Sequence, residues 1–182
     1  MSVIERDYYH TQEKRAEKLK QPVKSLRSDC WLGYGWYFWE ILDFAKAWGI
    51  QSKNKTGNYE IYKARIKSSY ILDTVFNREE YTVYSEMLDE IGRSFFSGTQ
   101  RLMSKRAMND YLQEKSDWEI EGILFADTPT NQRFSLIKNL FYRKRIQLVI
   151  FKLELVKSFE LVYTSASGSR FARKALRRNK GK

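Results

Sequence analysis

Trp31-Leu-Gly-Tyr-Gly-Trp-Tyr-Phe-Trp-Glu40 is the most distinctive stretch of this chain, with two glycines set among large apolar and aromatic side chains. Gly33 and Gly35 flank a single residue, so the backbone here can adopt a positive φ or allow the close approach of a ligand. Residues 37–39 favour a short strand, and residues 40–48 form an amphipathic run. We therefore predict a turn, a strand and a helix in that order, with aromatic rings gathered at the turn.

This order and spacing resemble the second signature of ADP-ribosyltransferases of the diphtheria-toxin and poly(ADP-ribose) polymerase type. The family signature is Gly-x-Gly-Ile-Tyr-Phe followed by a helix with small residues and an aromatic residue. This chain has Gly33-Tyr-Gly-Trp-Tyr-Phe38, with Ala45 and Trp48 behind it, and this pattern resembles that of small bacterial proteins of toxin type. The resemblance implies a nicotinamide pocket for NAD bordered by Gly35, with Tyr37 stacked on the nicotinamide and Trp48 as a second stacking ring. The alternative is an aromatic stretch that only packs in the core.

The first strand of that family corresponds to the N-terminal residues. Residues 3–11 favour a strand, and residues 12–20 have helical spacing before a proline. In the family this strand ends Tyr-His-Gly-Thr, where the histidine holds a hydroxyl of the nicotinamide ribose. An alignment without a gap puts Tyr9 at the histidine position, whereas an alignment on the histidine puts His10 there. Both alternatives stay open, with Thr11 beside the cofactor, and His10 as a plain surface residue is a third.

Residues 146–152 are nearly all apolar and predict a buried strand, with Gln147 as the exception. Polymerase-like relatives carry a catalytic glutamate at this position, whereas the small bacterial relatives resemble this chain in having glutamine, followed by an isoleucine where Val156 stands here. The resemblance implies that Gln147 accepts a hydrogen bond from the 2′-hydroxyl of the nicotinamide ribose. Without a charge, it stabilises a cationic ribosyl centre less than a carboxylate does.

A general base is needed to deprotonate the acceptor of the ADP-ribosyl group. Glu121 is placed in a loop before the last signature by its resemblance to a Glu-Gly pair in the toxin-like relatives, and Glu119 is its neighbour. Glu40 and Glu160 are weaker alternatives. The sequence names Glu121 first among these carboxylates without excluding the others.

Residues 128–144 combine aromatic and basic side chains, and the resemblance implies that this segment selects the target. Rings for stacking beside cations for phosphates are typical of proteins that hold single-stranded nucleic acid. The expected contacts are Phe141, Tyr142, Arg143, Lys144 and Arg145. The alternative is an ordinary helix whose apolar residues face the core.

Other patterns complete the expected fold. Strands are predicted over residues 59–67, 70–73 and 158–163, and helices over residues 77–96 and 101–115. The first of these helices has one continuous apolar stripe, made of Tyr84, Met87, Leu88, Ile91 and Phe95. The predicted class is α+β: a split antiparallel sheet flanked by helices, with residues 1–164 as an ADP-ribosyltransferase-like domain and 165–182 as a flexible basic tail.

The chain of 182 residues has a formal net charge of +11, and seven of its basic residues lie in 170–182, where there is no acid. Such a charge attracts phosphate backbones without specifying sequence. One cysteine, Cys30, excludes an internal disulfide framework, and no apolar run approaches the ~20 residues of a membrane span. We expect a cytoplasmic protein without metal, with RNA or single-stranded DNA as acceptor. The resemblance also implies a toxin–antitoxin or phage-defence setting with an antitoxin as partner.

Overall fold

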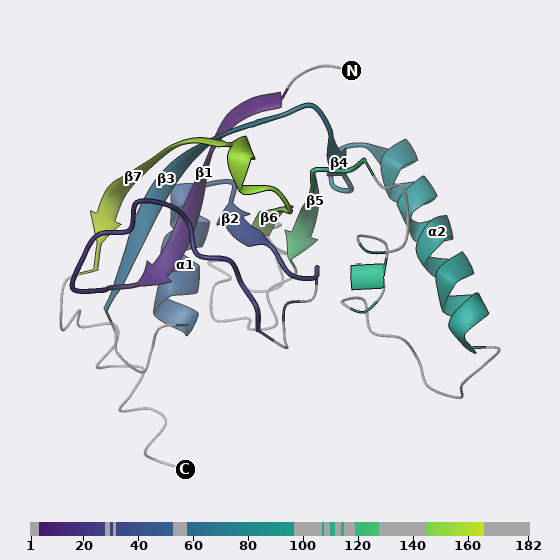
Figure 1. The fold of residues 1–182 in the computed structure, drawn as a ribbon, viewed down its shortest axis with the longest axis horizontal. Helices are drawn as coiled ribbons and strands as arrows, with labels where there is room; N and C mark the ends of the chain where they lie inside the picture. Colours follow the sequence, from purple (N-terminus) through teal and green to yellow (C-terminus); the bar gives the residue numbers. More distant parts are fainter. Residues whose placement is uncertain are drawn as a thin grey trace, which may run out of the picture.

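The computed structural model describes residues 4–27, 30, 32–52, 58–96, 107, 110, 111, 114, 119–127 and 145–165. These residues form a seven-stranded sheet and two helices, an α+β arrangement (Figure 1). In chain order the elements are β1 (Ile4–Glu13), β2 (Trp36–Trp39), α1 (Leu42–Ser52), β3 (Tyr59–Ser68), β4 (Ile71–Asp73), α2 (Arg78–Phe96), β5 (Gly122–Asp127), β6 (Arg145–Ile150), the 3-10 helix η2 (Leu153–Leu155) and β7 (Val156–Thr164).

The strands lie in the order β4-β5-β6-β2-β1-β3-β7. Neighbouring strands are antiparallel except β4 and β5, which are parallel with Leu72 opposite Ile123. A parallel pair needs a long connection, and here that connection includes α2. The sheet is therefore mixed, which corrects the expectation that it would be antiparallel throughout.

The sheet is split between β1 and β2. β1 pairs with β3 over its whole length, from Ile4 to Glu13, and β2 pairs with β6 at each of its four residues. By contrast, the register between β1 and β2 contains one pair, Tyr9 with Trp39. The sheet thus consists of one group, β4-β5-β6-β2, and another, β1-β3-β7, which meet at a narrow seam.

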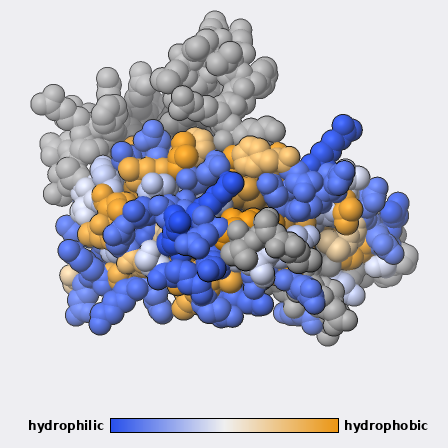
Figure 2. All heavy atoms as spheres, turned by 90° about the horizontal axis from the view of Figure 1, so that it is seen from above, coloured by the Kyte–Doolittle hydropathy of each residue, from blue (hydrophilic) through white to orange (hydrophobic). Residues whose placement is uncertain are grey.

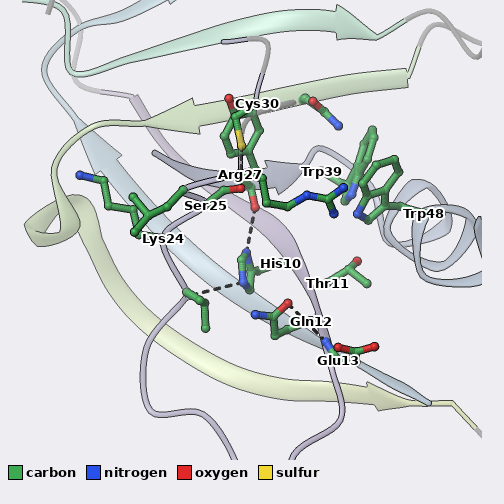
Figure 3. Close-up of a pocket in the computed structure, with 14 residues that line it drawn as sticks. His10, Thr11, Gln12, Glu13, Lys24, Ser25, Arg27, Cys30, Trp39 and Trp48 are labelled. Atoms are coloured by element: carbon green, nitrogen blue, oxygen red, sulfur yellow. Dashed lines mark hydrogen bonds between the residues drawn. The ribbon is translucent and has the colours of Figure 1, made fainter. Parts of the chain in front are cut away.

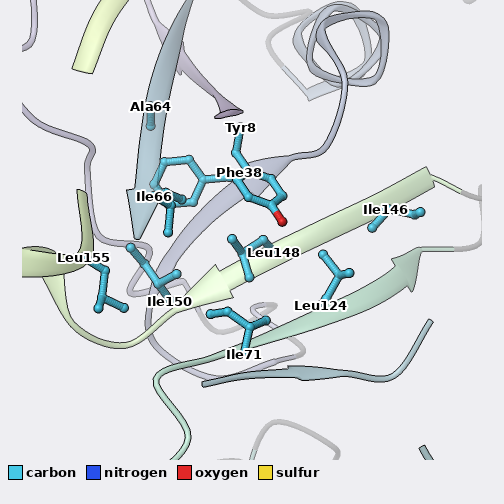
Figure 4. Close-up of a cluster of buried hydrophobic side chains, with 10 residues drawn as sticks. All are labelled: Tyr8, Phe38, Ala64, Ile66, Ile71, Leu124, Ile146, Leu148, Ile150 and Leu155. Carbon is cyan, nitrogen blue, oxygen red and sulfur yellow. The ribbon is translucent and has the colours of Figure 1, made fainter. Parts of the chain in front are cut away.

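Alternation along the strands gives this sheet two apolar faces. One face carries the buried cluster drawn in Figure 4, made of Tyr8, Phe38, Ala64, Ile66, Ile71, Leu124, Ile146, Leu148, Ile150 and Leu155. On the opposite face, Val149 packs in one cluster with Tyr84 of α2, and Trp39 packs in another with Ala45 of α1. Both helices therefore lie on the same side of the sheet, across the seam from each other.

The long helix predicted over residues 77–96 is confirmed as α2. Oδ1 of Asn77 accepts hydrogen bonds from the backbone N–H groups of Glu79 and Glu80, at 3.1 and 3.2 Å, and Asn77 donates from Nδ2 to Glu80 at 2.9 Å. These bonds satisfy N–H groups that have no partner within the helix. The stripe packs as predicted at Tyr84, with Met87 and Leu88 partly buried against the same cluster.

The predicted strands are confirmed, with boundaries shifted by a few residues. The helix expected over residues 12–20 is wrong. Gln12 and Glu13 continue β1 and pair with β3, and the backbone N–H of Leu19 donates to the Tyr62 hydroxyl at 3.1 Å. Tertiary pairing therefore overrides the local helical spacing. The segments 128–144 and 166–182, and most of 101–115, lie outside the described residues.

Candidate active site

A cavity of about 360 Å³ lies where β1 diverges from β2, which is within the size range of small-molecule sites. Its wall combines the end of β1, the loop before β2, β2 itself, α1 and β6 (Figure 3). The lining residues are His10, Thr11, Gln12, Glu13, Val23, Lys24, Ser25, Leu26, Arg27, Cys30, Tyr37, Trp39, Trp48 and Gln147. The structure thus brings five of the predicted site residues to one cavity: His10, Thr11, Tyr37, Trp48 and Gln147.

Tyr37 is held by the turn that precedes its own strand. Its hydroxyl donates to the carbonyl of Gly33 at 2.7 Å and accepts from the backbone N–H of Leu32 at 3.2 Å. Gly33 has a φ of 89°, which a residue with a side chain adopts at a cost. The glycine therefore allows the turn, and the turn fixes the direction of the tyrosine ring at the cavity.

Gly35 has a structural role that differs from the predicted contact with NAD. It does not line the cavity. A Cβ added there would lie 2.5 Å from Cγ2 of Val149 and 2.7 Å from the carbonyl oxygen of Ile150. Gly35 is thus needed for the close approach of the chain to β6, and its contact with NAD stays a prediction.

His10 is buried, and both of its ring nitrogens face backbone groups. Nδ1 lies 2.8 Å from the carbonyl oxygen of Tyr37, and the N–H of Val23 lies 3.4 Å from Nε2. Because a carbonyl only accepts and an amide N–H only donates, this arrangement fits a neutral imidazole with its proton on Nδ1. His10 thereby ties β1 to β2 across the seam while its ring borders the cavity.

Thr11 and Tyr9 lie on the face covered by α1. The Thr11 hydroxyl donates to the carbonyl of Ala45 at 2.9 Å, so it anchors α1 on β1 as well as lining the cavity. Tyr9 packs in the cluster with Trp39 and does not line the cavity. Of the two alternatives left open by the sequence, His10 is the one that borders the cavity.

Two tryptophans and a glutamine form the far wall. The ring centroids of Trp39 and Trp48 are 5.7 Å apart with an interplanar angle of 48°. Gln147 lies directly opposite Trp39 in the pairing of β6 with β2 and is 6 % exposed. No described residue gives its Oε1 a hydrogen bond. A buried acceptor without a donor is costly in a folded protein, and this one lies at the wall of a cavity.

The loop before β2 supplies lining residues that the sequence did not indicate as site residues. Ser25 pairs with Gly35 through a backbone hydrogen bond of 2.8 Å, which folds the loop back over the cavity. The Ser25 hydroxyl lies 2.7 Å from the thiol of Cys30. Figure 3 shows the Arg27 side chain extended towards Trp39 and Trp48, whereas Lys24 points the other way. The return of Ser25 to Gly35 has no local signal in the sequence.

The predicted general base Glu121 is not brought to the cavity. Its carboxylate accepts hydrogen bonds from the hydroxyl of Ser68 at 2.7 Å and from the backbone N–H of Ser69 at 2.9 Å. Burial raises the pKa of Glu121, but these bonds outweigh it and lower the pKa to about 2. The carbonyl oxygen of Glu121 accepts a hydrogen bond from the backbone N–H of Phe151. Phe151 lies four residues beyond Gln147, so this bond places the Glu121 backbone roughly 13 Å from Gln147 along the strand direction. Glu121 thus joins β3 to β5.

The other proposed carboxylates also lie elsewhere. Neither Glu40, Glu119 nor Glu160 lines the cavity, and Glu160 is paired with Lys63 at 2.8 Å. Among the described lining residues the one carboxylate is Glu13, at the end of β1. Glu13 lies four residues beyond Tyr9, the residue that pairs with Trp39, so it is roughly 13 Å from that pair along the strand. The prediction missed it because β1 was expected to end at residue 11.

Arg145 does not lie on the surface as a nucleic-acid contact would. It is 7 % exposed and forms an ion pair of 2.7 Å with Asp127. Burial raises the pKa of Asp127, and the guanidinium partly opposes that shift. The predicted contacts Phe141, Tyr142, Arg143 and Lys144 lie outside the described residues.

Comparisons with known proteins identify no relative of this chain. A scan against protein-family models and searches of curated proteins and of solved structures find no match.

Among the described residues, no three metal-ligating side chains come together, and no helix has the length and apolar character to cross a membrane. On the face seen in Figure 2, apolar residues are scattered among hydrophilic ones.

Proposed function

We propose that this chain is an NAD-dependent ADP-ribosyltransferase that transfers ADP-ribose to a nucleic acid, with RNA, including messenger RNA, as the favoured acceptor. The observation that carries the proposal is that Gln147, whose buried Oε1 lacks a donor among the described residues, is one of the residues that line a cavity bordered by three aromatic rings. A ribose hydroxyl would supply the missing donor. The residues present therefore fit the nicotinamide riboside end of NAD.

Each side chain has a definable part in that chemistry. NAD, when bound, supplies an ADP-ribosyl group whose bond to nicotinamide breaks with positive charge developing on the ribose. Tyr37, Trp39 and Trp48 offer flat apolar surfaces that stack on a ring and exclude water. Gln147 accepts a hydrogen bond and orients the sugar, and His10 keeps the two strands of the seam in place. Arg27 places positive charge at the rim, where a diphosphate would be attracted.

The net charge of +11 favours nucleic acid over protein as the acceptor. The resemblance to toxin-type proteins makes a toxin that blocks growth or phage production, neutralised by an antitoxin, part of the proposal. The acceptor must lose a proton to a base. Since Glu121 is bound to Ser68 and Ser69, we do not assign it that role.

The test is transfer of label from NAD. The full chain is incubated with NAD labelled in its adenylate phosphate and with total cell extract, and the products are treated with nuclease or with protease. Label that resists protease and is released by nuclease supports the proposal, whereas the opposite result indicates a protein acceptor. Tyr37→Ala should abolish labelling, and Tyr84→Phe, in the helix cluster, should leave it unchanged.

A second candidate is a non-catalytic RNA-binding domain. It is favoured by the absence of any carboxylate other than Glu13 among the described lining residues, and by the uncharged Gln147. This candidate predicts RNA binding that weakens steeply with salt and no consumption of NAD. Measurement of NAD by chromatography, with and without RNA, separates the two candidates.

A further inference from the structure

Arg145 is a buried cation that links three elements. A charge taken out of water must be paired and hydrogen-bonded. Its Nη2 forms the 2.7 Å ion pair with Asp127 at the end of β5, and its Nη1 donates to Oε1 of Gln51 in α1 at 3.1 Å. Arg145 itself begins β6. One guanidinium therefore holds β5, β6 and the last turn of α1 in fixed relation.

The same guanidinium lies over a ring of the cavity wall. Its central carbon is 5.4 Å from the centroid of the Trp39 ring, a cation–π distance. Trp39 in turn contacts Trp48, with centroids 5.7 Å apart. Both tryptophans line the cavity and Arg145 does not. Arg145 thus touches the wall of the cavity through Trp39 without lining the cavity itself.

The hydrogen bond from Arg145 to Gln51 also affects the position of Trp48, which lies on the same helix. Residues three apart on a helix are neighbours on its surface, so the hold on Gln51 acts on the turn that carries Trp48. The last turn of α1 has no basic residue of its own, and Arg145 brings positive charge to the helix end that favours it. Arg145 therefore fixes Trp39 through its ring and Trp48 through its helix.

We propose that Arg145 is a positioning residue, which holds Trp39 and Trp48 in the relative placement that makes them a stacking wall for the ring of a dinucleotide. This inference rests on the proposed function. It replaces direct contact with nucleic acid as the role of this arginine. A lysine at this position keeps the charge but lacks the planar fork that reaches Asp127, Gln51 and the indole face together.

The test is a double-mutant cycle on NAD affinity, measured by calorimetry with the full chain. Arg145→Lys should raise the Kd for NAD by about tenfold, the scale of one lost stacking contact. In a Trp48→Phe background the same change should add little, because both variants disturb one wall. Fully additive losses would overturn the inference, since they indicate that Arg145 acts elsewhere. Arg65→Lys is the matched control, because Arg65 pairs with Glu5 and Asp7 on the surface.

A second variant guards against unfolding. Gln51→Leu removes only the bond from Nη1 and should weaken NAD binding less than Arg145→Lys, again without additivity with Trp48→Phe. If Arg145→Lys instead weakens RNA binding while the affinity for NAD is unchanged, the direct-contact role is restored and the inference fails.

Near-ultraviolet circular dichroism separates this inference from the proposed function. If the wild-type chain binds no NAD, the proposed function fails. The positioning role is then decided by the near-ultraviolet signal that arises from the coupled indoles of Trp39 and Trp48. Loss of a signal in Trp48→Phe identifies it as the one that these two rings produce. Arg145→Lys should alter that signal and Arg65→Lys should not; an unchanged signal in Arg145→Lys overturns the positioning role.

Discussion

Gln147 and Trp39 are directly opposed in the pairing of β6 with β2, so a buried amide and an indole ring share one face of the sheet. Opposed residues of an antiparallel pair have Cβ atoms about 5 Å apart. The Oε1 of Gln147 has no donor among the described residues, an arrangement that costs about 1–3 kcal/mol. Gln147 lines the cavity, so under the proposed function a ribose hydroxyl would offset that cost.

The first prediction follows from that unsatisfied acceptor. Gln147→Leu should keep or raise the free energy of unfolding, by up to about 1 kcal/mol, because no hydrogen bond is lost from Oε1 and a buried polar group is removed. The same change should weaken NAD binding at least about tenfold. Urea unfolding and calorimetry measure the two effects separately.

Val149→Ala is the matched control, two residues along the same strand and face. It removes two buried methyl groups from the α2 cluster and should cost about 1–3 kcal/mol. Val149 itself does not line the cavity. A loss of stability in Gln147→Leu as large as that in Val149→Ala would show that the glutamine is held by a partner.

The second prediction separates the ring of Tyr37 from its hydroxyl. Tyr37→Phe should lower the free energy of unfolding by about 1–2 kcal/mol, because the hydroxyl bonds both Gly33 and Leu32. It should leave NAD affinity within about twofold, because the ring that stacks remains. Tyr37→Ala should lose both stability and NAD binding. Equal loss of affinity in the two variants would show that the hydroxyl, and not the ring, binds the ligand.

Local pattern was sufficient for much of the fold. The β-favouring run that contains Gln147 became β6, and the stripe from Tyr84 to Leu88 became the packed side of α2. These elements are stabilised by contacts that period and residue type already describe. The site residues His10, Tyr37, Trp48 and Gln147 came from the order of a resembling motif, and the structure places them around one cavity.

What the sequence did not predict depends on distant partners. Gln12 and Glu13 extend β1 because β3 pairs with them, although their spacing towards Leu19 is helical. Ser25 reaches the cavity because it bonds Gly35. Glu121 is withdrawn from it because Ser68 and Ser69, on another strand end, bind its carboxylate. Arg145 is buried because Asp127 and Gln51 lie within reach.

The third prediction concerns Glu121 and pH. Its pKa is lowered in the folded chain from 4.5 to about 2, so its contribution to stability is fully present above about pH 4.5 and is lost as pH falls towards 2. Glu121→Gln should reduce the free energy of unfolding at pH 7 by about 1 kcal/mol, and the difference from wild type should shrink below pH 4. Urea unfolding from pH 7 to pH 2.5 checks this. Transfer of ADP-ribose at pH 7 should be unchanged; its loss would return Glu121 to catalysis.

The fourth prediction tests the two glycines against each other. Gly35→Ala should lower the free energy of unfolding by about 2–3 kcal/mol, because the new methyl group meets Val149 and the carbonyl of Ile150. Gly33→Ala should cost about 1–2 kcal/mol, because its φ of 89° is strained for alanine. Urea unfolding ranks the two changes. If Gly35→Ala weakened NAD binding while stability stayed at the wild-type value, Gly35 would contact the cofactor as the motif implied. Loss of stability together with loss of NAD binding would instead show that Gly35 is needed for the close packing of the chain against β6.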